Sequence, residues 1–180
     1  MRKGFTLIEL LVILAAIGIL SAVVISTLKE AGAGGPTQSS SVSDVIQIPP
    51  ATDYAVDTTG TLSEQELIDL NAKLKNIQAS GKEVAVLVVG STAPIDIEAY
   101  GIRVGEAWKV GKKGLDNGVI LIVAKNDRKI RLEVGRGAEA DIPDAVAGDI
   151  IRTAIAPQLK AGNWAEGINA GVDAINAKLK

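Results

Sequence analysis

The chain has 180 residues and a formal net charge of −2, which allows one ordinary domain plus an appended segment and predicts no general affinity for nucleic acid. It contains no cysteine, which excludes thiol proteases, cysteine-dependent phosphatases, zinc ribbons and disulfide-stapled scaffolds. It also contains no histidine, which excludes Ser-His-Asp triads and the common zinc-hydrolase sites and leaves carboxylates, lysine, arginine, hydroxyl groups or a bound hard cation for any chemistry.

The N-terminal part is dominated by one apolar stretch. Residues 5–28 contain a single charge, Glu9, and no proline. At about 1.5 Å per residue, a helix of this length can cross a hydrocarbon core. Two basic residues precede it, which favours a cytoplasmic N-terminus and an exported C-terminal part. We therefore predict a leader peptide over residues 1–4 and a transmembrane or filament-core helix over residues 5–30.

The composition changes sharply after this stretch. Residues 31–52 are rich in glycine, serine, threonine and proline and show no helical period. Such a composition predicts a flexible linker, with a stiffer end at Pro49 and Pro50. We place the globular domain at residues 53–180.

The first elements of the domain are predicted as a helix, a strand and a second helix. Ser63 and Glu66 form a capping-box pattern, and Gly81 ends the helix that follows. Residues 83–89 are a short apolar run that suits a buried strand, and residues 95–110 have a helical pattern weakened by two glycines. The apolar face of the first helix is marked by Leu67, Leu70, Leu74 and Ile77.

The second half of the domain is predicted to contain a β-hairpin and two helices. Residues 118–124 and 129–134 flank a four-residue turn, and the second run alternates, with Ile130, Leu132 and Val134 facing inward. One helix is expected to start at Pro143 and end near Ala156, and the last to cover residues 164–179. The order of elements implies an α/β fold, an N-terminal hydrophobic helix plus a small α/β/α sandwich with a mixed sheet.

The first residues also carry a specific signature. Residues 3–9 read Lys-Gly-Phe-Thr-Leu-Ile-Glu and run directly into the apolar stretch. This pattern resembles the class III signal of type IV pilins and of secretion-system pseudopilins. The resemblance implies cleavage by a prepilin peptidase between Gly4 and Phe5, N-methylation of Phe5, and assembly through a helical bundle. In that family the glutamate, here Glu9, pairs with the terminal amine of a neighbouring subunit, here the amine of Phe5.

Two other interpretations of the N-terminal stretch are possible. An ordinary membrane anchor could use Glu9 only to complement the positive end of the helix dipole. A secretory signal peptide could be cut near Ala33 and release the domain, although the apolar stretch is longer than the usual 7 to 15 residues. The pilin-like interpretation is favoured, because a lone carboxylate in a lipid-buried helix is costly unless it is paired.

The domain resembles the TPM domain family from about residue 54 to residue 175. The resemblance implies an α/β/α sandwich and an exported domain. Some members of the family are reported as phosphatases or metal binders, and many have no settled activity. The order and spacing of short motifs carry the match: Val56-Asp57, Leu62-Ser63, Glu98-Ala99-Tyr100, Trp108 to Lys112, Asp116-Asn117-Gly118, Asp127-Arg128, Glu133-Val134-Gly135, Gly137, Glu139, Pro143-Asp144, Gly162, Asn163-Trp164 and Gly167-Ile168.

Carboxylates gather at the predicted loops and strand ends. Oxygen ligands from several loops suit Ca²⁺ or Mg²⁺, so the sequence predicts a divalent-cation site at Asp57, Asp116, Asn117 and Glu139. Asp127 is left out, because Asp116 and Asp127 lie at opposite ends of one predicted strand, some 25 to 35 Å apart. The alternative is that these residues form turns and helix caps.

Taken together, the sequence predicts a structural subunit of a type IV pilus-like extracellular filament with an outward-facing TPM domain. No catalytic residue is assigned, and an enzymatic role ranks below the structural one. The alternatives are a minor pseudopilin of a secretion or DNA-uptake system and a surface-anchored metal-dependent phosphatase. The expected partners are other copies of the chain, prepilin peptidase, the pilus assembly machinery and, before assembly, the cytoplasmic membrane. The final location is the cell surface.

Overall fold

The computed structural model describes residues 46–180, so the leader and the helix predicted over residues 5–30 lie outside the described residues. Within residues 46–180, no helix is both long and apolar enough to cross a membrane. The elements of this part are β1 (Ala55–Asp57), α2 (Glu64–Ala79), β2 (Glu83–Val89), α3 (Ile97–Trp108), β3 (Gly118–Ala124), β4 (Lys129–Val134), α4 (Asp144–Ile150), η1 (Ile151–Ile155), α5 (Ala156–Lys160) and α6 (Trp164–Lys178).

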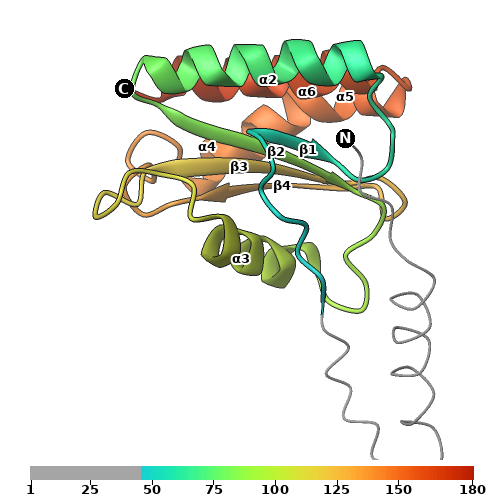
Figure 1. Ribbon diagram of the computed structural model, residues 1–180, viewed down its shortest axis with the longest axis horizontal. Coiled ribbons are helices and arrows are strands. Elements are labelled where there is room, and N and C mark those ends of the chain that lie inside the picture. The colour runs from blue at the N-terminus through green and yellow to red at the C-terminus, as the bar shows by residue number, and fades with distance from the viewer. Residues whose placement is uncertain (1–45) are drawn as a thin grey trace, which may run out of the picture. The chain divides into compact units, whose positions relative to one another are not determined.

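The four strands form one mixed sheet in the order β1-β2-β3-β4 (Figure 1). Strands β1, β2 and β3 are parallel, and β4 is antiparallel to β3, so the predicted hairpin is confirmed. The two central strands are almost entirely buried, because both faces of the sheet are covered. This explains why their sequences are continuous apolar runs.

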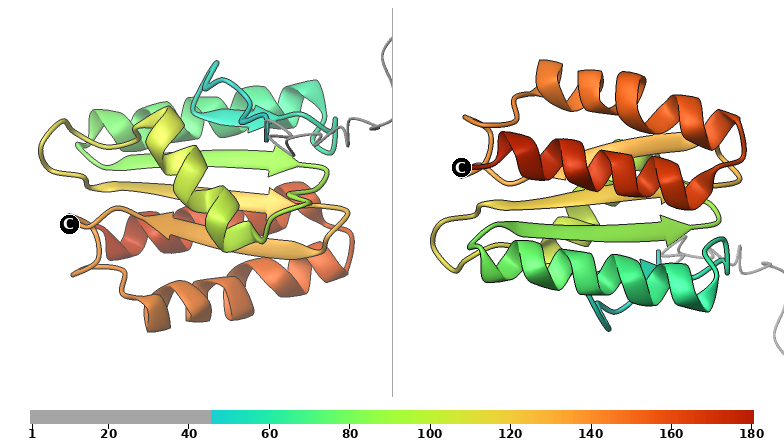
Figure 2. Two further views of the ribbon diagram at one scale, coloured as in Figure 1. Left: turned by 90° about the horizontal axis from the view of Figure 1, so that it is seen from below. Right: turned by 90° about the horizontal axis from the view of Figure 1, so that it is seen from above.

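Three helical segments cover one face of the sheet. Figure 2 shows α6 lying between α2 on one flank and the α4–η1–α5 segment on the other. The core under these helices joins alternate residues of β2 and β3, such as Val86 and Leu121, to Leu74 of α2 and Ile168 of α6. The periodic spacing of apolar residues that predicted these helices therefore marks the helix faces that pack against the sheet.

The opposite face is covered by α3 and by residues 46–49, which we call the entry strap. Ile46 and Ile48 contact the apolar cluster formed by α3 and this face of the sheet. The indole Nε1 of Trp108, at the end of α3, donates a 2.7 Å hydrogen bond to the carbonyl oxygen of Pro49. The folded head thus begins before residue 53, the predicted start. Part of the expected linker packs, beside α3, on this face of the sheet.

Helix α3 approaches the sheet closely at Gly101, one of the two glycines that weaken its sequence pattern. A Cβ atom at this position would lie 2.6 Å from Oε2 of Glu133. That carboxylate accepts a 2.7 Å hydrogen bond from Nε of Arg131 on the same strand. The glycine thus lowers helix propensity but makes room beneath α3 for an ion pair within β4.

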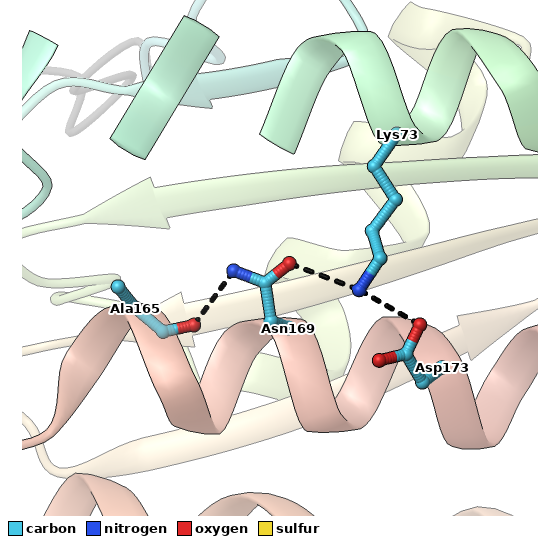
Figure 3. Close-up of polar contacts among 4 residues, drawn as sticks. All are labelled: Lys73, Ala165, Asn169 and Asp173. Atoms are coloured by element: carbon cyan, nitrogen blue, oxygen red, sulfur yellow. Dashed lines mark hydrogen bonds and ion pairs between the residues drawn. The ribbon is translucent and has the colours of Figure 1, made fainter. Parts of the chain in front are cut away.

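Helix α2 begins with the predicted capping box. Ser63 Oγ accepts from the backbone N–H of Glu66, and Glu66 Oε2 accepts from the backbone N–H of Ser63. Further along, Lys73 Nζ contacts Asp173 at 2.7 Å and Asn169 Oδ1 at 3.1 Å, which ties α2 to α6 (Figure 3). Because this pair is partly exposed, it contributes no more than about 1 kcal/mol.

The helix predicted to end near Ala156 continues to Lys160. Its middle, η1, is a π-helical turn, and α5 follows with Pro157 in its first turn. Proline has no N–H to donate, so it normally ends a helix. The wider π-helical turn changes the hydrogen-bond register just before Pro157, and the helical path continues past it.

Candidate functional site

The predicted cation ligands lie at opposite ends of the sheet. Asp57 is the last residue of β1 and pairs with Val88 near the carboxyl end of β2, whereas Asp116 and Asn117 precede the first residue of β3. Because these three strands are parallel, the two ends are about 20 Å apart by strand rise. The grouping of Asp57 with the other three residues was wrong: the distance argument that set Asp127 apart applies equally to Asp57.

Asp57 shapes the turn that leads into α2. Its Oδ1 accepts hydrogen bonds from the backbone N–H of Thr59 at 2.7 Å and from the hydroxyl of Thr59 at 2.6 Å. Its Oδ2 accepts from the backbone N–H of Leu62 at 2.8 Å. This is the turn-forming alternative considered for the sequence.

Three backbone segments meet at the amino end of β3, and we call residues 110–111, 115–118 and 135–137 the glycine-loop cluster. A Cβ atom at Gly118 would overlap the carbonyl oxygen of Val110, and one at Gly137 would overlap that of Leu115. The N–H of Gly137 donates a 2.8 Å hydrogen bond to the carbonyl oxygen of Asp116. Glycine is therefore needed at both positions, because the main chain of one segment lies where a Cβ atom would be.

The side chains of Asp116 and Asn117 already accept hydrogen bonds from nearby groups. Asp116 Oδ2 accepts from the backbone N–H of Arg136 at 3.2 Å and from its guanidinium Nε at 3.4 Å. Asn117 Oδ1 accepts from the backbone N–H of Lys112 at 2.9 Å, and Glu139 is exposed at the same end of the sheet. Among residues 46–180, no three carboxylates lie close enough to share one metal ion. The residues therefore do not form a ready-made cation site.

Cation binding by the remaining three residues stays a prediction. We expect Ca²⁺ to bind weakly, with a dissociation constant on the order of 10⁻³ M, because few free oxygens remain. An NMR titration of residues 46–180 should move the backbone signals around Asp116 and Glu139, and Asp116→Asn should abolish these changes. Asp149→Asn, an exposed helical carboxylate, is the matched control. Shifts centred on Asp57 instead would contradict this assignment.

Asp127 has a structural role that the sequence analysis missed. From the β3–β4 turn, its Oδ1 accepts from the hydroxyl of Ser91 at 2.7 Å, and its Oδ2 accepts from the backbone N–H of Thr92 at 2.8 Å. These hydrogen bonds, from Thr92 first and then Ser91, lower the pKa of Asp127 below its ordinary value of 3.8. Thr92 is a buried polar residue. The carboxylate thus fixes the loop between β2 and α3.

This lowered pKa predicts an acid-dependent stability difference. A carboxyl whose folded pKa is below its unfolded pKa stabilises the fold above the unfolded value and loses that contribution as pH falls through the folded value. Asp127→Ala is therefore expected to lower the free energy of unfolding at pH 7, with the deficit shrinking as the pH drops below 3.8. Urea unfolding at several pH values measures it. A deficit that is the same at every pH would show that the charge is irrelevant.

Comparison with known proteins identifies both parts of the chain. A family model described as the TPM domain matches residues 55–178, and one described as the prokaryotic N-terminal methylation motif matches residues 1–25. No curated protein matches the chain. The methylation motif indicates type IV pilin-like processing of a membrane-anchored precursor.

Solved structures agree with the fold. The N-terminal domain of a protein from P. gingivalis is 29% identical, with a TM-score of 0.64 over 71% of this chain and 82% of that one. The N-terminal domain of a Corynebacterium glutamicum protein is 21% identical, with a TM-score of 0.56 over 72% of this chain and 81% of that one, and shows the fold alone. With its mixed sheet and a family match over residues 55–178, the chain belongs to the TPM domain family.

Proposed function

We propose that the chain is a structural subunit of a type IV pilus-like extracellular filament, with its TPM domain on the outside. The observation that carries the proposal is the methylation motif over residues 1–25, joined in one chain to a domain whose hydrophobic core is built from residues 46–180. This head has a hydrophobic core of its own. The helix is then free to build the filament.

In this proposal, assembly begins in the cytoplasmic membrane. Prepilin peptidase cuts between Gly4 and Phe5, Phe5 is methylated, and the assembly machinery moves the subunit into the filament. The carboxylate of Glu9 pairs with the Phe5 amine of a neighbouring copy, and burial of the apolar helices supplies most of the stability. The final product is a helical homopolymer at the cell surface.

The TPM domain is the outward-facing head in this scheme. Among residues 46–180, every buried side-chain nitrogen and oxygen atom has a hydrogen-bond partner. The candidate site residues Asp57, Asp116 and Asn117 each accept a hydrogen bond from a nearby backbone N–H. Such internal satisfaction is what a stably folded head requires.

Electron microscopy of material sheared from expressing cells, combined with mass spectrometry of its N-terminus, tests the proposal. We expect filaments whose chains begin at methylated Phe5. Cells that process the chain but yield no filaments under conditions of high expression would overturn the proposal.

A minor pseudopilin of a secretion or DNA-uptake system is the second candidate, because it would carry the same methylation motif. The two functions differ in stoichiometry. A filament subunit should be the most abundant protein of the sheared fraction, whereas a pseudopilin should stay with the membrane and occur there in few copies. Quantitative mass spectrometry of the two fractions separates them.

Gly4→Ala is expected to block processing. Glycine has no Cβ, so the backbone at this position can approach the peptidase closely, and a methyl group would obstruct that approach. The variant should accumulate in the membrane as the precursor, which N-terminal sequencing detects. Thr6→Ala, two residues further on, should be cleaved normally. Recovery of chains beginning at Phe5 from the Gly4→Ala strain would refute this prediction.

A further inference from the structure

A basic cleft of about 670 Å³ opens at the carboxyl end of β3, between the β3–β4 turn and the α5–α6 loop. No acidic side chain lines it. Apolar side chains form part of its lining, and Trp164, at the start of α6, lies at one side. Four cationic side chains also line the cleft: Lys125, Arg128, Lys129 and Lys160.

The charges of the basic cleft are only partly offset by the head itself. Within the described part of the chain, none of these four cations belongs to an ion pair closer than 4.0 Å. Asp127 lies in the same turn, where its two oxygens accept hydrogen bonds from the β2–α3 loop and its charge offsets part of that of Lys129. Lys125 Nζ lies 5.4 Å from the centre of the Trp164 ring, a contact that keeps its charge. The cleft is therefore a concentrated positive site on a chain of net charge −2.

An acidic groove of about 750 Å³ runs along β1 and α2. It is lined by Asp53, Asp57 and Glu64, against one cation, Lys75. Ile68 of α2 also lines it and is 53% exposed, one of the few large apolar side chains left open to solvent in residues 46–180. The acidic groove thus has the opposite charge to the basic cleft and the same kind of apolar patch.

The basic cleft and the acidic groove belong to opposite flanks of the head. Strand β1 is one edge of the sheet, and the β3–β4 turn leads into the other edge strand, β4. On the helical face, α2 and the α4–η1–α5 segment lie on either side of α6 (Figure 2). One head therefore cannot close its own cleft with its own groove, but two copies can bring them together.

We propose that the basic cleft of one head packs against the exposed α2 rim of the acidic groove, which carries Glu64 and Ile68, on the next copy of this chain. The contact joins two different surfaces, so it is head-to-tail and can continue from copy to copy along an open helix. The opposite charges set the register, and burial of Ile68 adds apolar contact area. The contact rests on the proposed filament, which would hold neighbouring heads side by side at high local concentration.

The absence of native cysteine makes the contact directly testable by disulfide trapping. The full chain would carry Glu64→Cys in the acidic groove and Lys160→Cys at the basic cleft, both exposed positions. After mild oxidation of sheared filaments, a non-reducing gel should show a ladder extending beyond dimers. Each single variant should stop at dimers. The matched control is Glu106→Cys with Lys160→Cys, which places one cysteine at an exposed position of α3 outside both surfaces. It should give no ladder.

The outcomes separate this contact from the filament itself. Filaments that form normally but give no ladder overturn the contact and leave the proposed function intact. Absence of filaments overturns the proposed function, and the contact is then tested with the isolated head. Residues 46–180 contain both core clusters, so this fragment can be studied alone. Its concentration-dependent association should be lost in Lys160→Glu and restored when that variant is mixed with Glu64→Lys. Association unaffected by the reversal, or absent at millimolar concentration, overturns the contact.

Discussion

The yield of filaments from the Glu9→Ala chain is expected to be at least about tenfold lower than that from the unchanged chain. The substitution would leave the Phe5 amine of a neighbouring copy unpaired in an apolar bundle. Breaking a buried ion pair by removing one partner costs about 3–5 kcal/mol, and each 1.4 kcal/mol is about a factor of ten in an equilibrium constant. Several contacts of this kind repeat along a filament, so the loss compounds.

The measurement is the amount of chain in the sheared fraction relative to the membrane fraction. Glu30→Ala is the control, because it removes a carboxylate at the end of the predicted helix and should leave the yield unchanged. Circular dichroism of the purified chain should show a folded head in both variants. Wild-type yield from Glu9→Ala would rule out the charge pairing.

Gly118→Ala is expected to destabilise the head by about 3 kcal/mol or more. The new Cβ atom would overlap the carbonyl oxygen of Val110 and lie 2.9 Å from the backbone nitrogen of Gly111. Both are main-chain atoms of the glycine-loop cluster, so no side-chain rotation can relieve the overlap. The loop must move away from the start of β3, and steric changes of this kind belong to the most damaging class of point substitutions.

Urea unfolding of residues 46–180 measures this loss. Gly148→Ala is the matched control: it makes the same chemical change on exposed α4, where a Cβ atom would have no neighbour within 4 Å. Because alanine has a higher helix propensity than glycine, the control should gain up to about 1 kcal/mol. Equal stabilities of the two variants would show that the close backbone approach does not constrain the cluster.

The sequence predicted the longer elements of the domain well. Strands β2 and β3 are apolar runs bounded by turn residues, and the capping box at Ser63 marks the start of α2 within one residue. Patterns of this kind are local, so they can be recognised without knowing the fold. The mixed sheet and the covering of both faces followed from the order of the elements.

Features that depend on non-local contacts were not predictable in this way. The three-residue strand β1 has too little alternation to fix its direction, and its parallel pairing decides where Asp57 lies. Asp127 looks like an ordinary turn residue until the β2–α3 loop is placed beside it. The entry strap resembles linker in composition, and only the position of Trp108 shows that Pro49 is held.

The entry strap also determines how the head responds to tension. A pull along the linker reaches residues 46–49 before it reaches the sheet, and those residues are held by two isoleucine contacts and one indole hydrogen bond. They should peel off one contact at a time while the sheet stays intact. Each copy would then release about 13 Å of chain at the extended length of roughly 3.3 Å per residue. Every head would therefore supply a short length of slack before the load reaches its sheet.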